Sequence, residues 1–319
     1  MSKNLYYLHF NWRKKMMIED TYCEAFEGLV VQLMITAQDE EFLQRAANSF
    51  TALPSTIFGD AEGGVVRWLN ENETIDGRLG AIVQLWVIGT SKKSKENFYE
   101  QLGRRIRQGI LVVPTTAVFD YYPNDLESKF NMMNNVGHCG DGYEKIIERY
   151  GRKMINVPIM MGHDFLIEEH LTYAKGVMGG NLWLMCDSVE SGIKVGREAV
   201  KIISKMDNVC TTFDVCSAGS KPETNFPEIG PSTNHFYCPT LKNKLSSEDY
   251  KIPQGVNSIP EIVFNALDVD TIKNTMSNVI NGIAGMEGLI KVSTGNYGGK
   301  LGKFKIYLRD LDLKEDYFK

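Results

Sequence analysis

One acidic residue stands out because it lies in an otherwise apolar segment. Glu261 belongs to residues 260–266, PEIVFNA, which have the composition of a buried strand. Alternation along a strand places Glu261 on the face opposite Ile262 and Phe264. A carboxyl desolvated there has a raised pKa and can stay protonated near neutral pH, so Glu261 is a candidate catalytic acid. The alternative is a carboxylate on a solvated face of the sheet.

A second candidate is a glycine-rich segment that also carries cations. Residues 295–303, GNYGGKLGK, contain four glycines beside Lys300 and Lys303. Backbone N–H groups of such a segment can surround an anion, although a flexible turn between strands is the simpler reading. It is not a nucleotide-binding P-loop, because Thr294 and Leu301 replace the first glycine and the final Ser or Thr of that motif. The segment supplies four candidate substrate-binding residues: Asn296, Gly298, Gly299 and Lys300.

A third candidate, residues 231–240 (PSTNHFYCPT), is rich in short polar side chains. Ser232, Thr233 and Asn234 have the hydrogen-bonding groups that orient a polar ligand. Ordinary turn chemistry explains the same residues equally well.

Metal and thiol chemistry have little support. The pairs His138-Cys139 and His163-Asp164 are the local hints of a metal site or a nucleophilic dyad. Neither has a second pair at ligand spacing, so we predict no metal site. The six cysteines include no C-x-x-C pair, which favours free thiols in a reducing cytosol.

Bulk composition narrows the class of protein. The chain has 319 residues, 43% of them hydrophobic, which is ample for a large core. A net charge of −5 argues against nucleic acid as the main partner, because binding many phosphates needs a basic face. No apolar run approaches the roughly 18–20 residues of a membrane helix. We therefore expect a cytoplasmic protein without nucleic-acid or membrane partners.

The elements that must position these candidates follow a doubled order. Each half reads as strand, helix, strand, strand, helix, strand, which is the order of the ferredoxin-like split βαβ unit. The first half has strands at 28–36, 55–68, 81–88 and 110–113, a helix over 38–50 and a helix capped by Ser94. The second half has strands at 181–186, 209–215, 259–266 and 289–293, and helices begun by Ser188 or Ser191 and by Asp268 or Asp270.

Two insertions interrupt this order. Residues 129–161 predict a β-rich excursion with a turn at Tyr150-Gly151-Arg152. Residues 216–257 are rich in Pro, Ser, Asn and Gly, and long insertions of this kind are often functional loops. We therefore predict an α+β protein of two ferredoxin-like lobes with inserted β excursions.

Taken together, the ordered motifs resemble formylmethanofuran:tetrahydromethanopterin formyltransferase. The similarity runs from about residue 18 to residue 312. The segments that carry it are IEDTYCEAF (18–26), DAEGG (60–64), DGRLG (76–80), PTTAVFD (114–120), GDGYE (140–144), GVMGGN (176–181), STNHFYCPT (232–240), EIVFNAL (261–267) and GNYGGKLGK (295–303).

The resemblance implies an organisation and a reaction. It implies an N-terminal distal lobe over 18–156 and a C-terminal proximal lobe over 157–319, with residues 1–17 a non-native or over-called extension. Members are cytoplasmic homo-oligomers, commonly tetramers, with no bound metal or prosthetic group. Formylmethanofuran and tetrahydromethanopterin are their co-substrates in one-carbon metabolism and methanogenesis from CO₂.

The resemblance also implies a mechanism. The family's proposed catalytic glutamate matches Glu261. A pterin nitrogen attacks the formyl carbon, a tetrahedral intermediate forms and the methanofuran amine leaves. A protonated carboxyl can supply the proton that this amine needs.

Several segments depart from the family's pattern and leave two other readings open. The departures fall at residues 52–56, 59–64, 112–113, 162–165 and 212–214. One reading is a diverged, non-catalytic paralogue that acts as a binding or assembly subunit of a formyl-hydrolysing complex. The other is a transferase for a different pterin or furan carrier.

Overall fold

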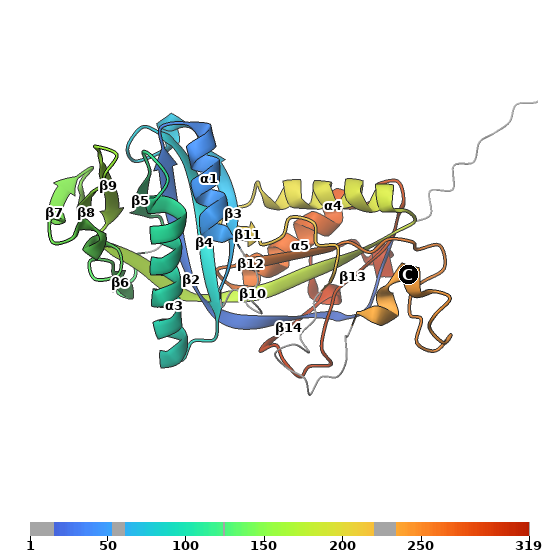
Figure 1. Cartoon of the computed structure of the whole chain (residues 1–319). Helices are drawn as coiled ribbons and strands as arrows, with labels where there is room; N and C mark the ends of the chain where they lie inside the picture. The colour runs from blue at the N-terminus through green and yellow to red at the C-terminus, as the bar shows by residue number, and fades with distance from the viewer. Residues whose placement is uncertain (1–15, 53–60, 124, 220–233, 319) are drawn as a thin grey trace, which may run out of the picture.

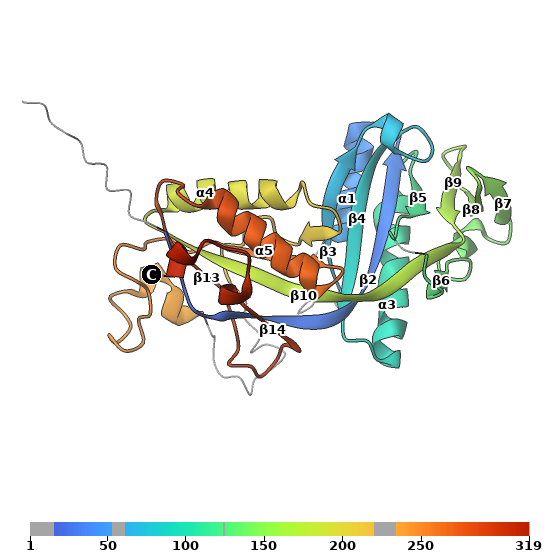
Figure 2. The ribbon, with the colours of Figure 1, turned by 180° about the vertical axis from the view of Figure 1, so that it is seen from behind.

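The computed structural model describes residues 16–52, 61–123, 125–219 and 234–318, which form two lobes (Figure 1). In the distal lobe, strands pair antiparallel in the order β3-β4-β2-β5. Helices α1 and α3 lie on one face of this sheet, in front of it in Figure 1 and behind it in Figure 2. The elements are β2 (Tyr22–Ala37), α1 (Glu40–Thr51), β3 (Glu62–Leu69), β4 (Leu79–Ile88), α3 (Lys92–Arg105) and β5 (Ala117–Asp120).

The proximal lobe repeats this arrangement. Its strands pair antiparallel in the order β11-β12-β10-β13, and α4 packs beside α5 on one face of the sheet (Figure 2). The doubled ferredoxin-like prediction is therefore confirmed. The elements are β10 (His170–Cys186), α4 (Val189–Ile203), β11 (Val209–Thr211), β12 (Glu261–Ala266), α5 (Val269–Ile283) and β13 (Leu289–Ser293).

Two long strands join the lobes. β2 has 16 residues and β10 has 17, and both run through the two lobes (Figure 1). Residues 26–31 of β2 pair antiparallel with residues 173–178 of β10, so the two sheets form one continuous sheet. β2 and β10 can approach this closely because residue 28 is glycine. A Cβ at Gly28 would lie 2.2 Å from the sulfur of Met178.

The remaining strands extend this framework. The predicted excursion is β-rich, with β8 between β7 and β9, and Tyr150 and Gly151 form its turn with φ values of 55° and 69°. The remaining elements are β1 (Met17–Ile18), β6 (Lys129–Asn131), β7 (Lys145–Arg149), β8 (Arg152–Pro158), β9 (Asp164–Glu168), β14 (Phe304–Tyr307) and the short helices Glu71–Glu73, Ile106–Leu111, Gly137–Gly140, His235–Tyr237, Pro239–Leu241, Leu308–Asp310 and Glu315–Phe318. Among the described residues, no helix is long and apolar enough to cross a membrane.

Local side chains explain where most helices begin. The side chains of Asp39, Ser188 and Asp268 each accept a hydrogen bond from a backbone N–H in the first turn of α1, α4 and α5. The prediction of Ser94 as the cap of α3 was wrong. Ser91 is the cap and accepts from the N–H of Ser94, because the first helical turn starts three residues earlier.

The prediction of a strand at 110–113 was also wrong. Ile106–Leu111 continues the helix as a π-helical turn, and the fourth strand of the lobe is β5. Phe98, Leu102, Ile106 and Ile110 are all fully buried and lie four residues apart, so the helical stripe extends through Ile110. The strand predicted at 209–215 also ends early, at Thr211.

Candidate functional site

Glu261 is a buried carboxyl in the proximal lobe. Its side chain is 2% exposed, and β12 places it on the face opposite Ile262 and Phe264, which pack into the core beneath α4 and α5. The indole N–H of Trp183, on the neighbouring strand β10, donates to Oε1 of Glu261 at 3.0 Å. Alternation along the strand therefore assigned the face correctly, and tertiary packing removed that face from solvent.

Glu261 lines a cavity of about 280 Å³. The cavity walls come from the segment before β2, strand β10, the residues around the short helix His235–Tyr237, Lys251, the start of β12, and the end of β13 with the loop that follows. The lining residues are Glu19, Thr21, Trp183, Asn234, Phe236, Tyr237, Lys251, Glu261, Ser293, Thr294, Gly295, Asn296 and Tyr297.

The structure brings three of the predicted site residues together and leaves others apart. Glu261, Asn234 and Asn296 line the same cavity, although they lie far apart in the sequence. Gly298, Gly299 and Lys300 are not among its lining residues, and the side chain of Lys300 is exposed. Ser232 and Thr233 lie outside the described residues. The assignment of these residues to substrate binding stays a prediction.

Asn181 holds the start of the glycine-rich segment, just after β13, against β10. Its side-chain oxygen accepts hydrogen bonds from the Thr294 hydroxyl at 2.9 Å and from the Gly295 N–H at 2.7 Å. The Thr294 hydroxyl also lies 2.7 Å from the backbone carbonyl of Asn181. Asn181 is 6% exposed and Thr294 is 3% exposed, so these bonds are shielded from water. The part of the cavity wall that Thr294 and Gly295 form is therefore fixed to β10.

The glycine-rich segment does surround an anion, but the anion belongs to the protein. The carboxylate of Glu24, on β2, accepts hydrogen bonds from four backbone N–H groups of the glycine-rich segment. The N–H of Gly298 donates instead to the side chain of Asn296 at 3.1 Å. The N–H groups of Gly298 and Gly299 thus already have partners within the protein.

The buried thiol of Cys23, which contacts Asn181, is not a thiolate. Burial raises the pKa of Cys23 to about 11, against the opposing effect of hydrogen bonds with Asn181 and Thr294. Burial also raises the pKa of Tyr237, helped by the charge of Glu19. Both groups therefore keep their protons near neutral pH, and Cys23 is a poor nucleophile.

The histidines singled out in the sequence have structural partners. His163 Nε2 accepts from the backbone N–H of Thr115 at 2.9 Å, and His138 Nδ1 lies 3.0 Å from the carbonyl of Asn134. Within the part of the chain that the structure describes, no three His, Cys, Asp or Glu side chains gather in a way that could hold a metal ion.

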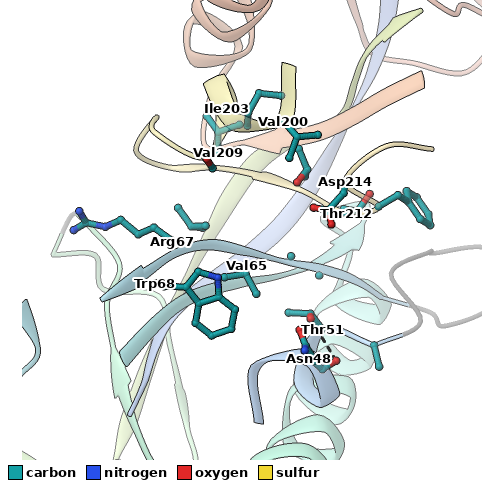
Figure 3. Close-up of a pocket in the computed structure, with 17 residues that line it drawn as sticks. Asn48, Thr51, Val65, Arg67, Trp68, Val200, Ile203, Val209, Thr212 and Asp214 are labelled. Atoms are coloured by element: carbon teal, nitrogen blue, oxygen red, sulfur yellow. Dashed lines mark hydrogen bonds between the residues drawn. The ribbon is translucent and has the colours of Figure 1, made fainter. Parts of the chain in front are cut away.

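A larger cavity, of about 630 Å³, lies elsewhere, between the two lobes (Figure 3). Asn48 and Thr51 of α1 and Val65 of β3 face it from the distal lobe, and Ile203 of α4 and Thr212 face it from the proximal lobe. Large pockets are the usual first guess for a ligand site, but Glu261 does not line this one. Its walls include residues from three of the segments that depart from the family's sequence pattern: Ala52, Gly63, Gly64, Thr212, Phe213 and Asp214.

Sequence reasoning missed three residues of this region: Trp183, Asn181 and Glu24. Trp183 and Asn181 owe their roles to the pairing of distant strands, which no local pattern shows. Glu24 did carry a signal, since it is a carboxylate in the apolar segment YCEAF, the same kind of signal that identified Glu261.

Comparisons with known proteins agree with the fold. The family model described as formylmethanofuran-tetrahydromethanopterin formyltransferase matches residues 13–159, and the model described as its proximal lobe matches residues 163–311. A formyltransferase-like protein of Archaeoglobus fulgidus is 52% identical over 92% of this chain and 96% of its own length.

Two solved structures are similar along nearly the whole chain. The formylmethanofuran:tetrahydromethanopterin formyltransferase of Methanosarcina barkeri has a TM-score of 0.82 and 37% identity, covering 92% of this chain and 97% of its own. A chain of the formyltransferase/hydrolase complex of Methylorubrum extorquens, solved with methylofuran, has a TM-score of 0.79 and 27% identity, covering 92% and 96%. This chain belongs to the formylmethanofuran:tetrahydromethanopterin formyltransferase family.

Proposed function

We propose that this protein transfers a formyl group between formylmethanofuran and tetrahydromethanopterin, with Glu261 as the acid. The observation that carries the proposal is the burial of the Glu261 carboxyl in a cavity shared with Asn234 and Asn296. Similarity along both lobes to the formyltransferase of Methanosarcina barkeri supports the choice of substrates.

The chemistry needs one proton at a defined place. The pterin nitrogen forms a bond to the formyl carbon, and the carbonyl oxygen becomes an oxyanion in a tetrahedral intermediate. The bond from that carbon to the methanofuran nitrogen then breaks. An amine leaves poorly as an anion, so Glu261 in its protonated form donates its proton to the leaving nitrogen. The carboxylate left on Glu261 takes up the proton that the pterin nitrogen releases, which restores the acid. Because the formyl carbon passes directly from one nitrogen to the other, no covalent enzyme intermediate forms.

Burial favours this role for Glu261. A carboxyl that is 2% exposed is largely separated from water, and desolvation disfavours its charged form. The hydrogen bond from Trp183 to Oε1 fixes the plane of the carboxyl. Because that oxygen accepts a hydrogen bond, the proton of the acid form resides on Oε2, which is the atom proposed to donate it.

The test uses purified protein with both carriers and follows formation of formyl-tetrahydromethanopterin by absorbance. Glu261→Gln should lower kcat by about 10²–10⁴-fold, the range of general acid catalysis. Glu168→Gln is the matched control, because it removes a part-buried carboxylate of β9 that pairs with Arg152 and does not line the cavity. Full activity of Glu261→Gln would contradict the role of Glu261 as the acid, but it would not contradict the proposed formyl transfer.

A second candidate function is an assembly subunit without activity of its own. Two observations favour it: the 52% identical relative carries a formyltransferase-like name, and a similar chain belongs to a formyltransferase/hydrolase complex. The departing segments that meet at the inter-lobe cavity are compatible with a changed ligand or partner. This alternative predicts that the wild-type protein alone transfers no formyl group.

A third candidate is transfer involving a different furan or pterin carrier. The similar chain from Methylorubrum extorquens was solved with methylofuran, which motivates this choice. Running the same assay with formyl-methylofuran as the donor separates it from the first candidate.

We further infer that the protein works in the cytoplasm as a homotetramer. The family resemblance supports this assembly. Size-exclusion chromatography with light scattering tests it, and a monomer at assay concentration would contradict it.

A further inference from the structure

A second buried glutamate binds the glycine-rich segment from inside the protein. Glu24 lies on β2 and is fully buried. Its Oε2 accepts hydrogen bonds from the backbone N–H groups of Tyr297 at 2.8 Å and Gly299 at 3.0 Å. Its Oε1 accepts from Leu301 and Gly302, both at 2.6 Å. A single carboxylate thus has four backbone donors from one segment.

This geometry is that of an anion-binding nest whose anion is part of the fold. Gly298 and Gly299 have φ values of 67° and 75°, the left-handed region, which curves the segment so that the N–H groups on both sides of Gly298 reach one carboxylate. Burial alone would raise the pKa of Glu24, but the four donors outweigh it and the pKa lies below its ordinary value. Glu24 is therefore charged near neutral pH, and its hydrogen bonds are of the strong, charge-assisted kind.

The segment held by Glu24 forms one wall of the Glu261 cavity. Asn296 and Tyr297 line that cavity, and Tyr297 is one of the four donors to Glu24. The side chain of Asn296 also donates to the hydroxyl of Thr21, just before β2, at 3.2 Å. The shape of this wall thus depends on contacts with the start of β2, and the Glu24 carboxylate provides most of them.

We propose that Glu24 is a positioning residue for substrate binding, whose carboxylate holds residues 295–303 in the conformation that forms this wall. The link to binding rests on the proposed function, whereas the link to the order of the segment rests on the geometry alone. Glu24 does not line the cavity, so it acts through Asn296 and Tyr297. Its loss should therefore weaken substrate binding more than it slows the chemical step.

The decisive variant is Glu24→Gln. The amide keeps the shape of the side chain but presents an NH₂ group to one pair of backbone donors, which then lack an acceptor. Glu24→Asp keeps the charge and should restore part of the effect. Glu27→Gln is the matched control, since Glu27 also lies on β2 and binds the same segment, but through one ion pair with the side chain of Lys303 at 2.6 Å.

The first measurement is amide hydrogen exchange of residues 295–303 without substrate. Glu24→Gln should raise exchange in this segment by about tenfold or more while the strands of the proximal lobe keep their protection. Glu24→Asp should lie between, and Glu27→Gln should match wild type. Equal exchange in Glu24→Gln and Glu27→Gln would overturn the proposal. This readout holds even if the protein transfers no formyl group.

The second measurement is steady-state kinetics with both carriers. KM should rise about tenfold in Glu24→Gln, equivalent to about 1.4 kcal/mol, with kcat changed less than about threefold. A fall in kcat with unchanged KM would refute the positioning role. If wild type is inactive, the proposed function has failed, and hydrogen exchange alone decides whether Glu24 orders the segment.

Gly302→Ala disturbs the same contact from the other side, and replaces Glu24→Gln if that variant does not fold. A Cβ at Gly302 would lie 2.5 Å from Cγ of Glu24 and 2.8 Å from the carbonyl of Ala25. It should therefore push the segment away from the carboxylate and raise both exchange and KM. Wild-type values for both would contradict the inference.

Discussion

Trp183 and Glu261 face each other directly across the antiparallel pair of β10 and β12, and the indole N–H of Trp183 donates to Oε1 of Glu261 at 3.0 Å. Side chains opposite each other in such a pair lie on the same face of the sheet. Register therefore places a fixed donor beside the one carboxyl proposed to do chemistry. The ring of Trp183 in turn packs edge-on against Tyr237, at 4.8 Å between centroids.

Trp183→Phe should lower kcat about tenfold without unfolding the protein. Phenylalanine keeps a ring against Tyr237 but cannot donate to Glu261, so the carboxyl loses its fixed plane. The predicted loss is what one hydrogen bond of ordinary strength contributes, about 1.4 kcal/mol. Kinetics and circular dichroism check it together. An unchanged kcat would mean that the hydrogen bond has no part in orienting the acid.

Asn181→Leu should reduce the free energy of unfolding by about 1–3 kcal/mol, the cost of a buried polar group left without a partner. The N–H of Gly295 loses the Asn181 side-chain oxygen, whereas the Thr294 hydroxyl keeps its bond to the backbone carbonyl of residue 181. Urea denaturation measures the change. Asn278→Ala is the control, since this exposed residue of α5 bonds only to the side chain of Asn274, and it should change stability by less than about 0.5 kcal/mol.

Asp120→Asn should stabilise the protein at neutral pH and lose that advantage in acid. Burial raises the pKa of Asp120, although a hydrogen bond from the Thr172 hydroxyl opposes the rise. A carboxyl whose pKa is raised by folding favours the folded state below its ordinary pKa, and this contribution is lost as pH rises through the folded value.

The check on Asp120→Asn is a thermal melt at pH 7 and at a pH below about 3.9, the ordinary value for aspartate. Tm should exceed that of wild type at pH 7, because the variant carries no buried charge. In acid the wild-type side chain is also neutral, so the two melting temperatures should converge. A lower Tm for the variant at pH 7 would contradict the prediction.

Gly64→Ala should weaken the contact between the lobes. A Cβ at Gly64 would lie 2.2 Å from the carbonyl oxygen of Thr211, so β3 and β11 would have to separate. Overpacking of this kind costs about 1–3 kcal/mol, and the loss should appear in the unfolding midpoint. Gly142→Ala is the control, because its Cβ would meet nothing within 4 Å and the substitution carries only the strain of a positive φ. An unchanged unfolding midpoint in Gly64→Ala would contradict the prediction.

The sequence by itself determined the order of the elements, most helix starts and the buried carboxyl that we propose as the acid. Asp39, Ser188 and Asp268 cap helices through atoms three residues away, so local sequence contains the whole interaction. The doubled order strand, helix, strand, strand, helix, strand could be predicted because the apolar periodicity of each element is also a local property of the sequence. Glu261 was recognisable because a charge in an apolar strand conflicts with its surroundings.

Only the tertiary structure decided which groups meet. Ile110 lies in a helix because it packs beneath α1, although its neighbours Leu111 and Val112 suit a strand equally well. Glu24 fills the nest of a segment more than 270 residues away, which turns an expected ligand cradle into a structural contact. Trp183 reaches Glu261 only through the pairing of β10 with β12. Each of these contacts joins residues far apart in the chain, and its energy depends on burial that the fold as a whole creates.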